Sequence, residues 1–212
     1  MLIFGTRIPM TKKRTAKEAV NVRKRPGQKR SADTVAVIVE AAARILERNG
    51  FEGFNTNAIA EKAGVSIGSL YQYFPGKNAL LGAIIERETA PLLAVSEELA
   101  GIQRCDEALR CCIRASIRHQ MRRPHLARLI DVAEKREMFN DQVSSKASRM
   151  QVVLERILSL PDAPRVRSRS VAAADLLAII RSLIDMAGER GEGESVRLLR
   201  RVEGAVWGYL RC

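Results

Sequence analysis

The chain has 212 residues and a formal net charge of +12, with 36 Lys and Arg residues against 24 Asp and Glu. This length suits one compact domain, or a small domain joined to a larger one, with enough apolar surface to fold without disulfides or metals. The basic excess favours a polyanionic partner, either nucleic acid or an anionic membrane surface. No apolar run approaches the roughly 18 residues of a membrane span, and no signal peptide is recognisable at the start, so we expect a cytoplasmic protein.

Most of the excess charge lies in the first 30 residues. They contain ten basic side chains, Lys29 and Arg30 among them, and one acid, Glu18. They lack helical or strand periodicity, which predicts a flexible basic arm over residues 1–30. Such an arm gains affinity for DNA through phosphate contacts and counterion release, whereas the alternative is a solvated tail that only aids solubility. Residues 31–90 hold five basic and seven acidic side chains, which favours a role for the arm in binding.

The rest of the chain shows the apolar periodicity of helices and no alternating strand pattern. Pro91 is expected to kink or interrupt the fourth helix. The predicted helices span about 33–49, 56–62, 66–72, 77 onward, 105–121, 124–139, 141–160, 167–187 and 194–210. We therefore predict an all-α fold of about nine helices.

The segment from Thr56 to Lys77 carries the clearest functional pattern. Gly64 permits a sharp turn that sets two short helices at a steep angle. Val65 and Leu70 are expected to hold the second of these helices against the core. The side chains then left facing outward belong to Ser66, Ile67, Gly68, Ser69 and Gln72. A protruding helix of this size fits the major groove of B-DNA.

Each outward residue of this helix suits a contact with DNA. Gly68 has no side chain, so the backbone can approach a base or phosphate closely, while Ile67 can contact a thymine methyl and Gln72 can pair with adenine. Hydroxyl groups and one positive charge are offered at phosphate height by Thr56, Ser66, Tyr71, Tyr73 and Lys77. The alternatives are a core helical hairpin with an incidental glycine turn, or a packing role for either tyrosine.

The same residues resemble the signature of the TetR (tetracycline repressor) family. The run is Ile59-Ala60…Ala63-Gly64-Val65-Ser66…Gly68…Leu70-Tyr71…Tyr73-Phe74…Lys77, and the similarity extends over residues 33–85. It implies a three-helix DNA-binding domain at residues 31–78, followed by a helical effector-binding and dimerisation domain at 79–212. By position, Thr56, Ser66, Ser69, Tyr71, Tyr73 and Lys77 resemble phosphate contacts, and Ile67, Gly68 and Gln72 resemble base-proximal positions.

The resemblance also implies a homodimer through the last two helices, about 167–187 and 194–210. A two-fold axis then presents two recognition helices to a palindromic operator in double-stranded DNA. The alternative for these helices is ordinary core packing. An unidentified small-molecule effector is expected among the helices of residues 92–160, where His119, Gln120 and Arg128 are polar candidates with exposed or structural roles as the alternative.

The four cysteines favour packing over chemistry. Cys105, Cys112 and His119 are seven residues apart on one helix face, which separates neighbours by about 10 Å, whereas one metal needs ligands about 2.0–2.3 Å away. We expect free thiols, no metal and no cofactor, although a thiol sensor, or a metal site that includes His119 or His125, is the sharper alternative.

The predicted function is a sequence-specific transcriptional regulator, a repressor that a ligand releases from DNA. No catalytic motif is present, so no enzymatic activity is predicted, and a cysteine-dependent enzyme is the remote alternative. The main alternative is a sequence-independent DNA architectural protein that binds through its basic arm.

Overall fold

The computed structural model describes residues 29–134 and 146–212, which form nine α-helices and one 3-10 turn and contain no strand. The helices are α1 (Lys29–Asn49), α2 (Thr56–Ala63), α3 (Ile67–Tyr73), α4 (Lys77–Glu98), α5 (Cys105–Arg122), α6 (Pro124–Glu134), α8 (Lys146–Ile157), α9 (Arg169–Glu189) and α10 (Val196–Leu210), and the turn η2 (Leu99–Gly101) follows α4. The predicted all-α fold of about nine helices is confirmed. Within the described residues, no helix is long and apolar enough to cross a membrane.

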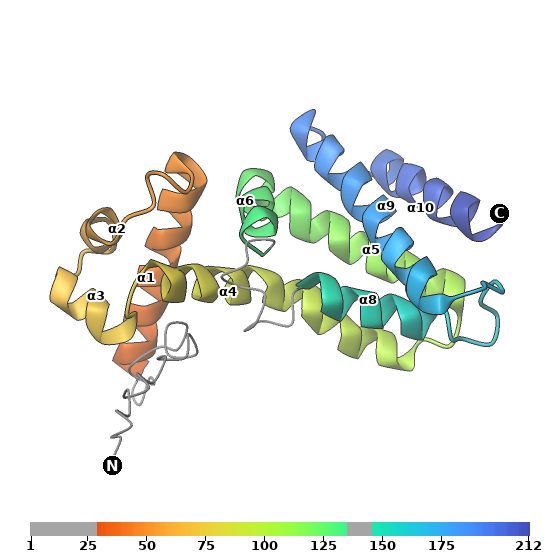
Figure 1. Ribbon diagram of the computed structural model, residues 1–212, viewed down its shortest axis with the longest axis horizontal. Coiled ribbons are helices and arrows are strands. Elements are labelled where there is room, and N and C mark those ends of the chain that lie inside the picture. The colour runs from red at the N-terminus through yellow and green to blue at the C-terminus, as the bar shows by residue number, and fades with distance from the viewer. Residues whose placement is uncertain (1–28, 135–145) are drawn as a thin grey trace, which may run out of the picture.

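A first hydrophobic cluster holds the amino-terminal helices together. Its fully buried members include Ile38 and Leu46 of α1, Ile59 of α2 and Leu70 of α3. The start of α4 closes this cluster, and α6 also contributes Leu126 and other apolar side chains. Figure 1 shows α2 and α3 at one end of the molecule, with α1 crossing α4 and α6 beside them. The amino-terminal helices therefore share their core with a helix that comes much later in the chain.

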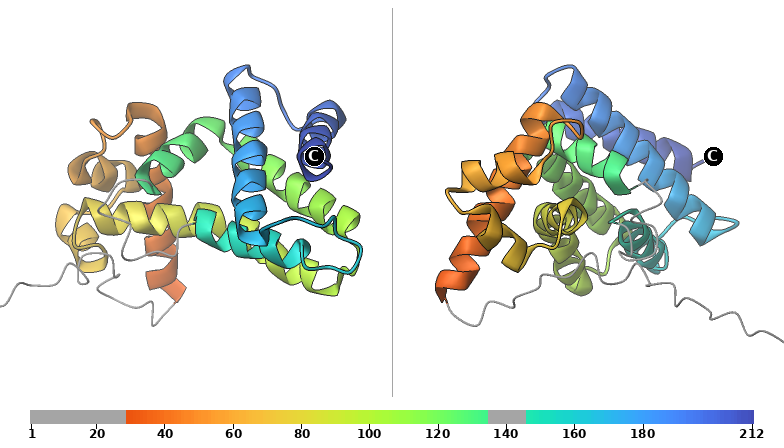
Figure 2. Two further views of the ribbon diagram at one scale, coloured as in Figure 1. Left: turned by 45° about the vertical axis from the view of Figure 1, so that its right-hand side comes forward. Right: turned by 60° about the vertical axis from the view of Figure 1, so that its left-hand side comes forward.

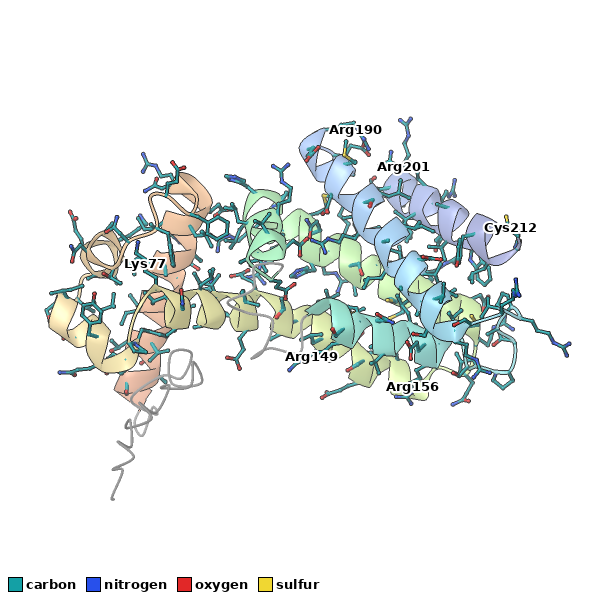
Figure 3. The ribbon with its side chains drawn as sticks, viewed as in Figure 1. Lys77, Arg149, Arg156, Arg190, Arg201 and Cys212 are labelled. Carbon is teal, nitrogen blue, oxygen red and sulfur yellow. The ribbon has the colours of Figure 1, made fainter. Side chains whose placement is uncertain are left out.

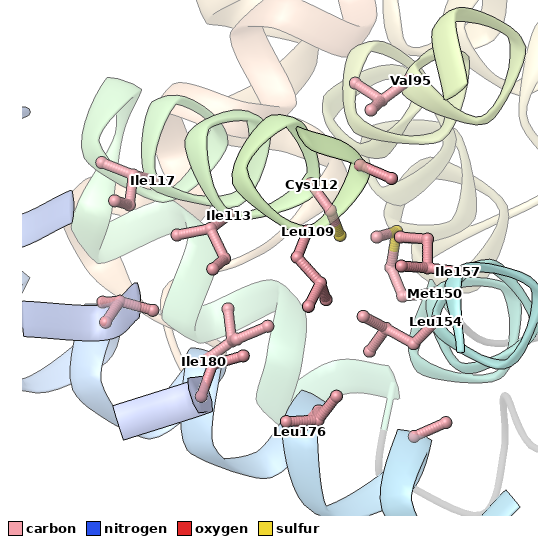
Figure 4. Close-up of a cluster of buried hydrophobic side chains, with 14 of the residues drawn as sticks. Val95, Leu109, Cys112, Ile113, Ile117, Met150, Leu154, Ile157, Leu176 and Ile180 are labelled. Atoms are coloured by element: carbon pink, nitrogen blue, oxygen red, sulfur yellow. The ribbon is translucent and has the colours of Figure 1, made fainter. Parts of the chain in front are cut away.

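A second cluster holds the other helices. The second half of α4 packs with α5, α8, α9 and α10 around Leu109, Ile113, Leu154 and Leu176, which are all fully buried (Figure 4). Figures 1 and 2 show α9 and α10 side by side at the end of the molecule remote from α3. Because α4 contributes to both clusters, one continuous helix joins the two ends of the molecule.

The expectation that Pro91 interrupts the fourth helix is wrong in that respect, since α4 continues from Lys77 to Glu98. Proline removes one backbone hydrogen bond and disfavours the preceding helical turn. Here Leu92 and Val95, directly after the proline, are buried in the second cluster. Their packing offsets the local cost, because tertiary burial and not intrinsic propensity dominates helix stability in proteins.

The first helix begins earlier than expected. α1 starts at Lys29 and not at Asp33, so Lys29 and Arg30 belong to its first turn and not to the predicted arm. Lys and Arg are good helix formers, and no glycine or proline separates them from Asp33. The remainder of the predicted arm, residues 1–28, and residues 135–145 of the loop before α8 lie outside the described residues.

Candidate nucleic-acid interface

The turn between α2 and α3 is built by local signals in the sequence. Asn55 caps α2, because its side chain accepts a 2.8 Å hydrogen bond from the backbone N–H of Ala58. Gly64 ends the helix with φ +66°, in the left-handed region that glycine adopts without strain. Its N–H bonds back to the carbonyls of Ala60 and Glu61. The chain is thereby turned sharply between the two short helices, as the sequence predicted.

Helix α3 is capped and anchored from one side only. The Ser66 hydroxyl accepts a 3.1 Å bond from the Ser69 N–H and donates to the Ser69 hydroxyl at 2.9 Å. Leu70 and Phe74 are fully buried, whereas Val65, expected in the core, is half-buried. The helix is therefore held by its inner face and by its amino-terminal cap, which leaves its outer face available.

The outer face collects the predicted contact residues. Ile67 and Tyr71 are 39% and 41% exposed, which is unusual for large apolar side chains. The hydroxyls of Thr56 and Tyr71 lie 3.2 Å apart, so the start of α2 is tied to α3. The other predicted residues on this surface are Ser66, Gly68, Gln72 and Lys77, all exposed, and Ser69, half-buried. Figure 3 shows Lys77 at the same end of the molecule as α2 and α3.

Tyr73 differs from the other predicted contacts. It is only 9% exposed, and its hydroxyl accepts a 3.4 Å hydrogen bond from Ser31 of α1. The structure thus gives its ring a packing role, which is the alternative left open for the tyrosines. A phosphate contact by its hydroxyl stays a prediction. Ser31 was not singled out in the sequence, because its proximity to Tyr73 depends on how α1 packs against α3.

Gly68 has no role that the fold explains. A Cβ atom added there would approach no neighbouring atom more closely than Ser66 Oγ at 3.9 Å, which is ordinary van der Waals contact. Its backbone is not in the left-handed region, and glycine inside a helix costs about 1 kcal/mol relative to alanine. The absence of a side chain therefore favours an external partner that approaches the helix closely.

Anchoring of α3 gives a direct prediction for stability. Replacing Leu70 by alanine should lower the free energy of unfolding by about 2–5 kcal/mol, because it opens a cavity beneath a seven-residue helix. Urea denaturation followed by circular dichroism measures this. The control is Ile67→Ala, one turn away on the exposed face, which should change stability by less than about 0.5 kcal/mol. Equal effects of the two substitutions would contradict the orientation described for α3.

The buried cysteines lie within the second cluster and away from the surface of α3. Cys112 packs among Leu109, Met150 and Ile157 (Figure 4). Burial raises the pKa of its thiol to about 12, and burial together with the Asp162 carboxylate raises that of Cys105 to about 11. No group of three or more His, Cys, Asp or Glu side chains in the described ranges is arranged to hold a metal.

Thiol labelling should therefore separate the cysteines. In the folded protein at about pH 8, iodoacetamide is expected to modify Cys212, which is exposed, while Cys105 and Cys112 stay protected because their thiolates are disfavoured and inaccessible. Mass spectrometry of the peptides, before and after unfolding in urea, gives the readout. Modification of Cys112 in the folded protein at the rate of Cys212 would show that the thiol is not buried.

Comparisons with known proteins identify the amino-terminal part of the chain. Residues 38–84 match the sequence model of the bacterial regulatory proteins of the tetR family. The chain belongs to the TetR family. The matched residues run from α1 to the first part of α4 and include the whole α2–α3 unit.

Relatives of this TetR-family chain are similar over the same region. The HTH-type transcriptional repressor KstR of Mycolicibacterium smegmatis is 36% identical over 63 residues, which is 30% of this chain and 31% of KstR. The HTH-type transcriptional regulator RutR of Escherichia coli is 37% identical over 83 residues, 37% and 39% of the two chains. The chain thus matches about a third of the length of these relatives.

Solved structures extend the likeness to the whole fold. FadR of Bacillus halodurans, a fatty acid degradation regulator, superposes with a TM-score of 0.72 at 15% identity and covers 89% of this chain and 99% of its own. A TetR-like regulator from Rhodococcus gives 0.70 at 21% identity, with 85% and 97% covered. FadR of Bacillus subtilis, solved with stearoyl-CoA, gives 0.66 at 16% identity, with 82% and 96% covered. At these identities the likeness shows the fold alone.

Proposed function

We propose that this TetR-family chain is a homodimeric transcriptional regulator that binds a palindromic operator and leaves it when a small molecule binds. The observation that carries the proposal is the outer face of α3, where a glycine without a role in the fold lies among exposed Ile67, Tyr71 and Gln72. The relatives named above support it, because they are described as HTH-type repressors or regulators.

The geometry suits a recognition helix in the major groove. Ile67, Gly68 and Gln72 would face base edges. Around them, the paired hydroxyls of Thr56 and Tyr71 and those of Ser66 and Ser69 would contact phosphates on either side. Lys77 stands in the first turn of α4, where the helix dipole adds to its positive charge. Phosphate contacts fix the position of the protein on the duplex, and the base contacts supply sequence preference.

The outer surface of α9 and α10 suits a dimer interface. Both helices pack on α5, so their exposed stripes face away from it. The exposed residues recur every four positions and are mostly small or apolar: Ser170, Ala174, Ala178, Ser182 and Met186 on α9, and Val196, Arg200, Gly204 and Gly208 on α10. Small side chains let two helix pairs approach closely, so a four-helix bundle around a two-fold axis would bury this surface.

The helical domain is in contact with the proposed reading domain at one charged joint. Arg123, in the turn between α5 and α6, pairs with Glu47 and Glu40 of α1 and with Glu88 of α4. Arg87 adds ion pairs to Glu40 and Glu88. Since α6 is also buried in the first cluster through Leu126, a change at α6 would reach α1 and α4 together. This supports regulation of DNA binding from the helical domain.

A double substitution tests the proposed function. Tyr71→Ala with Lys77→Ala should keep the circular dichroism spectrum and remove the footprint on operator DNA, because both side chains are exposed and make no core contact. The control is Arg156→Ala, which removes a charge at the far side of the molecule (Figure 3) and should footprint normally. An unchanged footprint of the double variant would contradict the proposed site, and equal affinity for all sequences would favour the architectural alternative.

A further inference from the structure

A small cavity lies in the helical domain between α4, α5, α6, α8 and α9. Its volume is about 60 Å³, which holds about four water molecules at roughly 10–15 Å³ each. Its apolar wall comes from Leu92, Met150, Leu177, Ile180 and Ile184. The cavity is therefore large enough for a ligand of a few carbon atoms without any movement of the helices.

The opposite wall of the cavity is a chain of charged groups. Arg181 Nη2 lies 3.0 Å from a carboxylate oxygen of Asp131 on α6, and its Nε lies 3.7 Å from Asp185. The amide of Gln120 on α5 donates a 2.6 Å hydrogen bond to Asp185. Asp131 and Gln120 are 4% and 6% exposed. Ser116 and His119 complete the polar lining.

The charge of this wall is unbalanced. Two carboxylates meet one guanidinium, and Gln120 brings no charge. Arg181 is already shared between both carboxylates, so it has little capacity left for an anionic ligand. A carboxylate or phosphate entering here would meet net negative charge, while an ammonium group would balance it, and buried charges are stable only when paired.

We propose that this cavity binds a small aliphatic amine as the effector, with its ammonium group on Asp131 and Asp185 and its hydrocarbon chain against Leu92, Ile180 and Ile184. The ammonium competes with Arg181 for the two carboxylates. As an effector site this rests on the proposed function, because it gives that regulator its ligand class. As a binding site it rests on the cavity alone.

The position of Asp131 connects this site to the reading domain. Asp131 lies on α6 directly after Ile130, which is 1% exposed in the first cluster together with Leu126. The Asp131–Arg181 pair joins α6 to α9. An amine that separates this pair loosens α6 from α9 and changes how α6 presses on α1, so binding of the amine lowers the affinity for DNA.

Three probes of equal length test the charge that the cavity selects. Butylammonium chloride, sodium butyrate and 1-butanol are added at millimolar concentration and equal ionic strength to the full-length protein, and the melting temperature is recorded. Butylammonium should raise it, because a ligand that binds only the folded state stabilises it, and the other two probes should leave it unchanged. Equal or greater stabilisation by butyrate or butanol overturns the proposal.

Substitution of one carboxylate locates the site. Asp185→Asn keeps the shape of the side chain and removes one charge, so calorimetry should show butylammonium binding weakened about tenfold or more, as expected for a lost hydrogen bond to a charged group. The control is Glu189→Gln on the same helix, whose carboxylate pairs with Arg128 on the surface. Unchanged binding to Asp185→Asn, or equal weakening by Glu189→Gln, contradicts this placement.

The regulatory step has its own readout. Butylammonium should weaken operator binding of the wild-type protein and have less effect on Asp185→Asn. Amine binding without any change in DNA affinity overturns the role as effector. Absence of specific DNA binding under all conditions overturns the proposed function, and this result is separate from the calorimetric one, which needs no DNA.

Discussion

Replacing Gly68 by alanine is expected to abolish tight operator binding while leaving the folded protein as stable as before, or slightly more stable. The added methyl group meets only Ser66 Oγ at 3.9 Å in the free protein, and alanine is the better helix former by about 1 kcal/mol. In the complex, the same methyl group would stand between α3 and the floor of the major groove. A dimer carries it twice, so at about 1–3 kcal/mol for each disturbed reading position the loss is about 2–6 kcal/mol, at least thirty-fold in Kd.

Fluorescence anisotropy on a labelled operator duplex measures this loss, and urea denaturation measures stability in parallel. The matched control is Gly101→Ala, at another exposed glycine with open space around its Cβ position in η2, far along the chain from α3. It should bind like the wild type. Normal DNA affinity of Gly68→Ala would show that α3 does not approach DNA closely at this position.

Replacing Gly204 by arginine is expected to dissociate the dimer into folded monomers. Gly204 is exposed in the middle of α10, with no atom within 4 Å of its Cβ position, so an isolated chain accommodates the side chain. In the proposed bundle the bulky cation would face a second copy of itself and the neighbouring Arg200. Like charges brought together at an interface cost several kcal/mol, so the dimer should weaken by about a hundred-fold or more.

Sedimentation equilibrium gives the dimer dissociation constant directly, with Gly101→Arg as the control for an added surface charge. The operator affinity of Gly204→Arg should fall as well, because a monomer reads only one half-site. A variant that stays dimeric with the wild-type constant would place the interface elsewhere on the molecule.

The helix-turn-helix was predictable because its signals are local. The cap at Asn55, the left-handed Gly64 and the cap at Ser66 each act within four residues of their own position, so the sequence alone locates both short helices. The periodicity of the later segments likewise predicts α5, α9 and α10 to within a few residues, since apolar residues on one face require a partner surface whatever that partner is.

What the sequence could not supply depends on contacts between distant segments. Tyr73 and Tyr71 are alike in sequence, but only the packing of α1 decides that Tyr73 is buried. The apolar face of α6 was predicted as a pattern, yet its burial with α1 and not within the helical domain follows from tertiary structure. The same is true of the cavity wall, where Asp131 and Arg181 are 50 positions apart in the chain.

Selection of bound duplexes from a random DNA pool by the full-length protein tests the central claim most directly. A dimer that reads DNA through two α3 helices should enrich one inverted repeat, with half-sites one helical turn apart or a multiple of it, and Gly68→Ala should fail to enrich it. Recovery of duplexes with no common sequence, equally by both proteins, would contradict the account and would point to sequence-independent attraction by the basic chain.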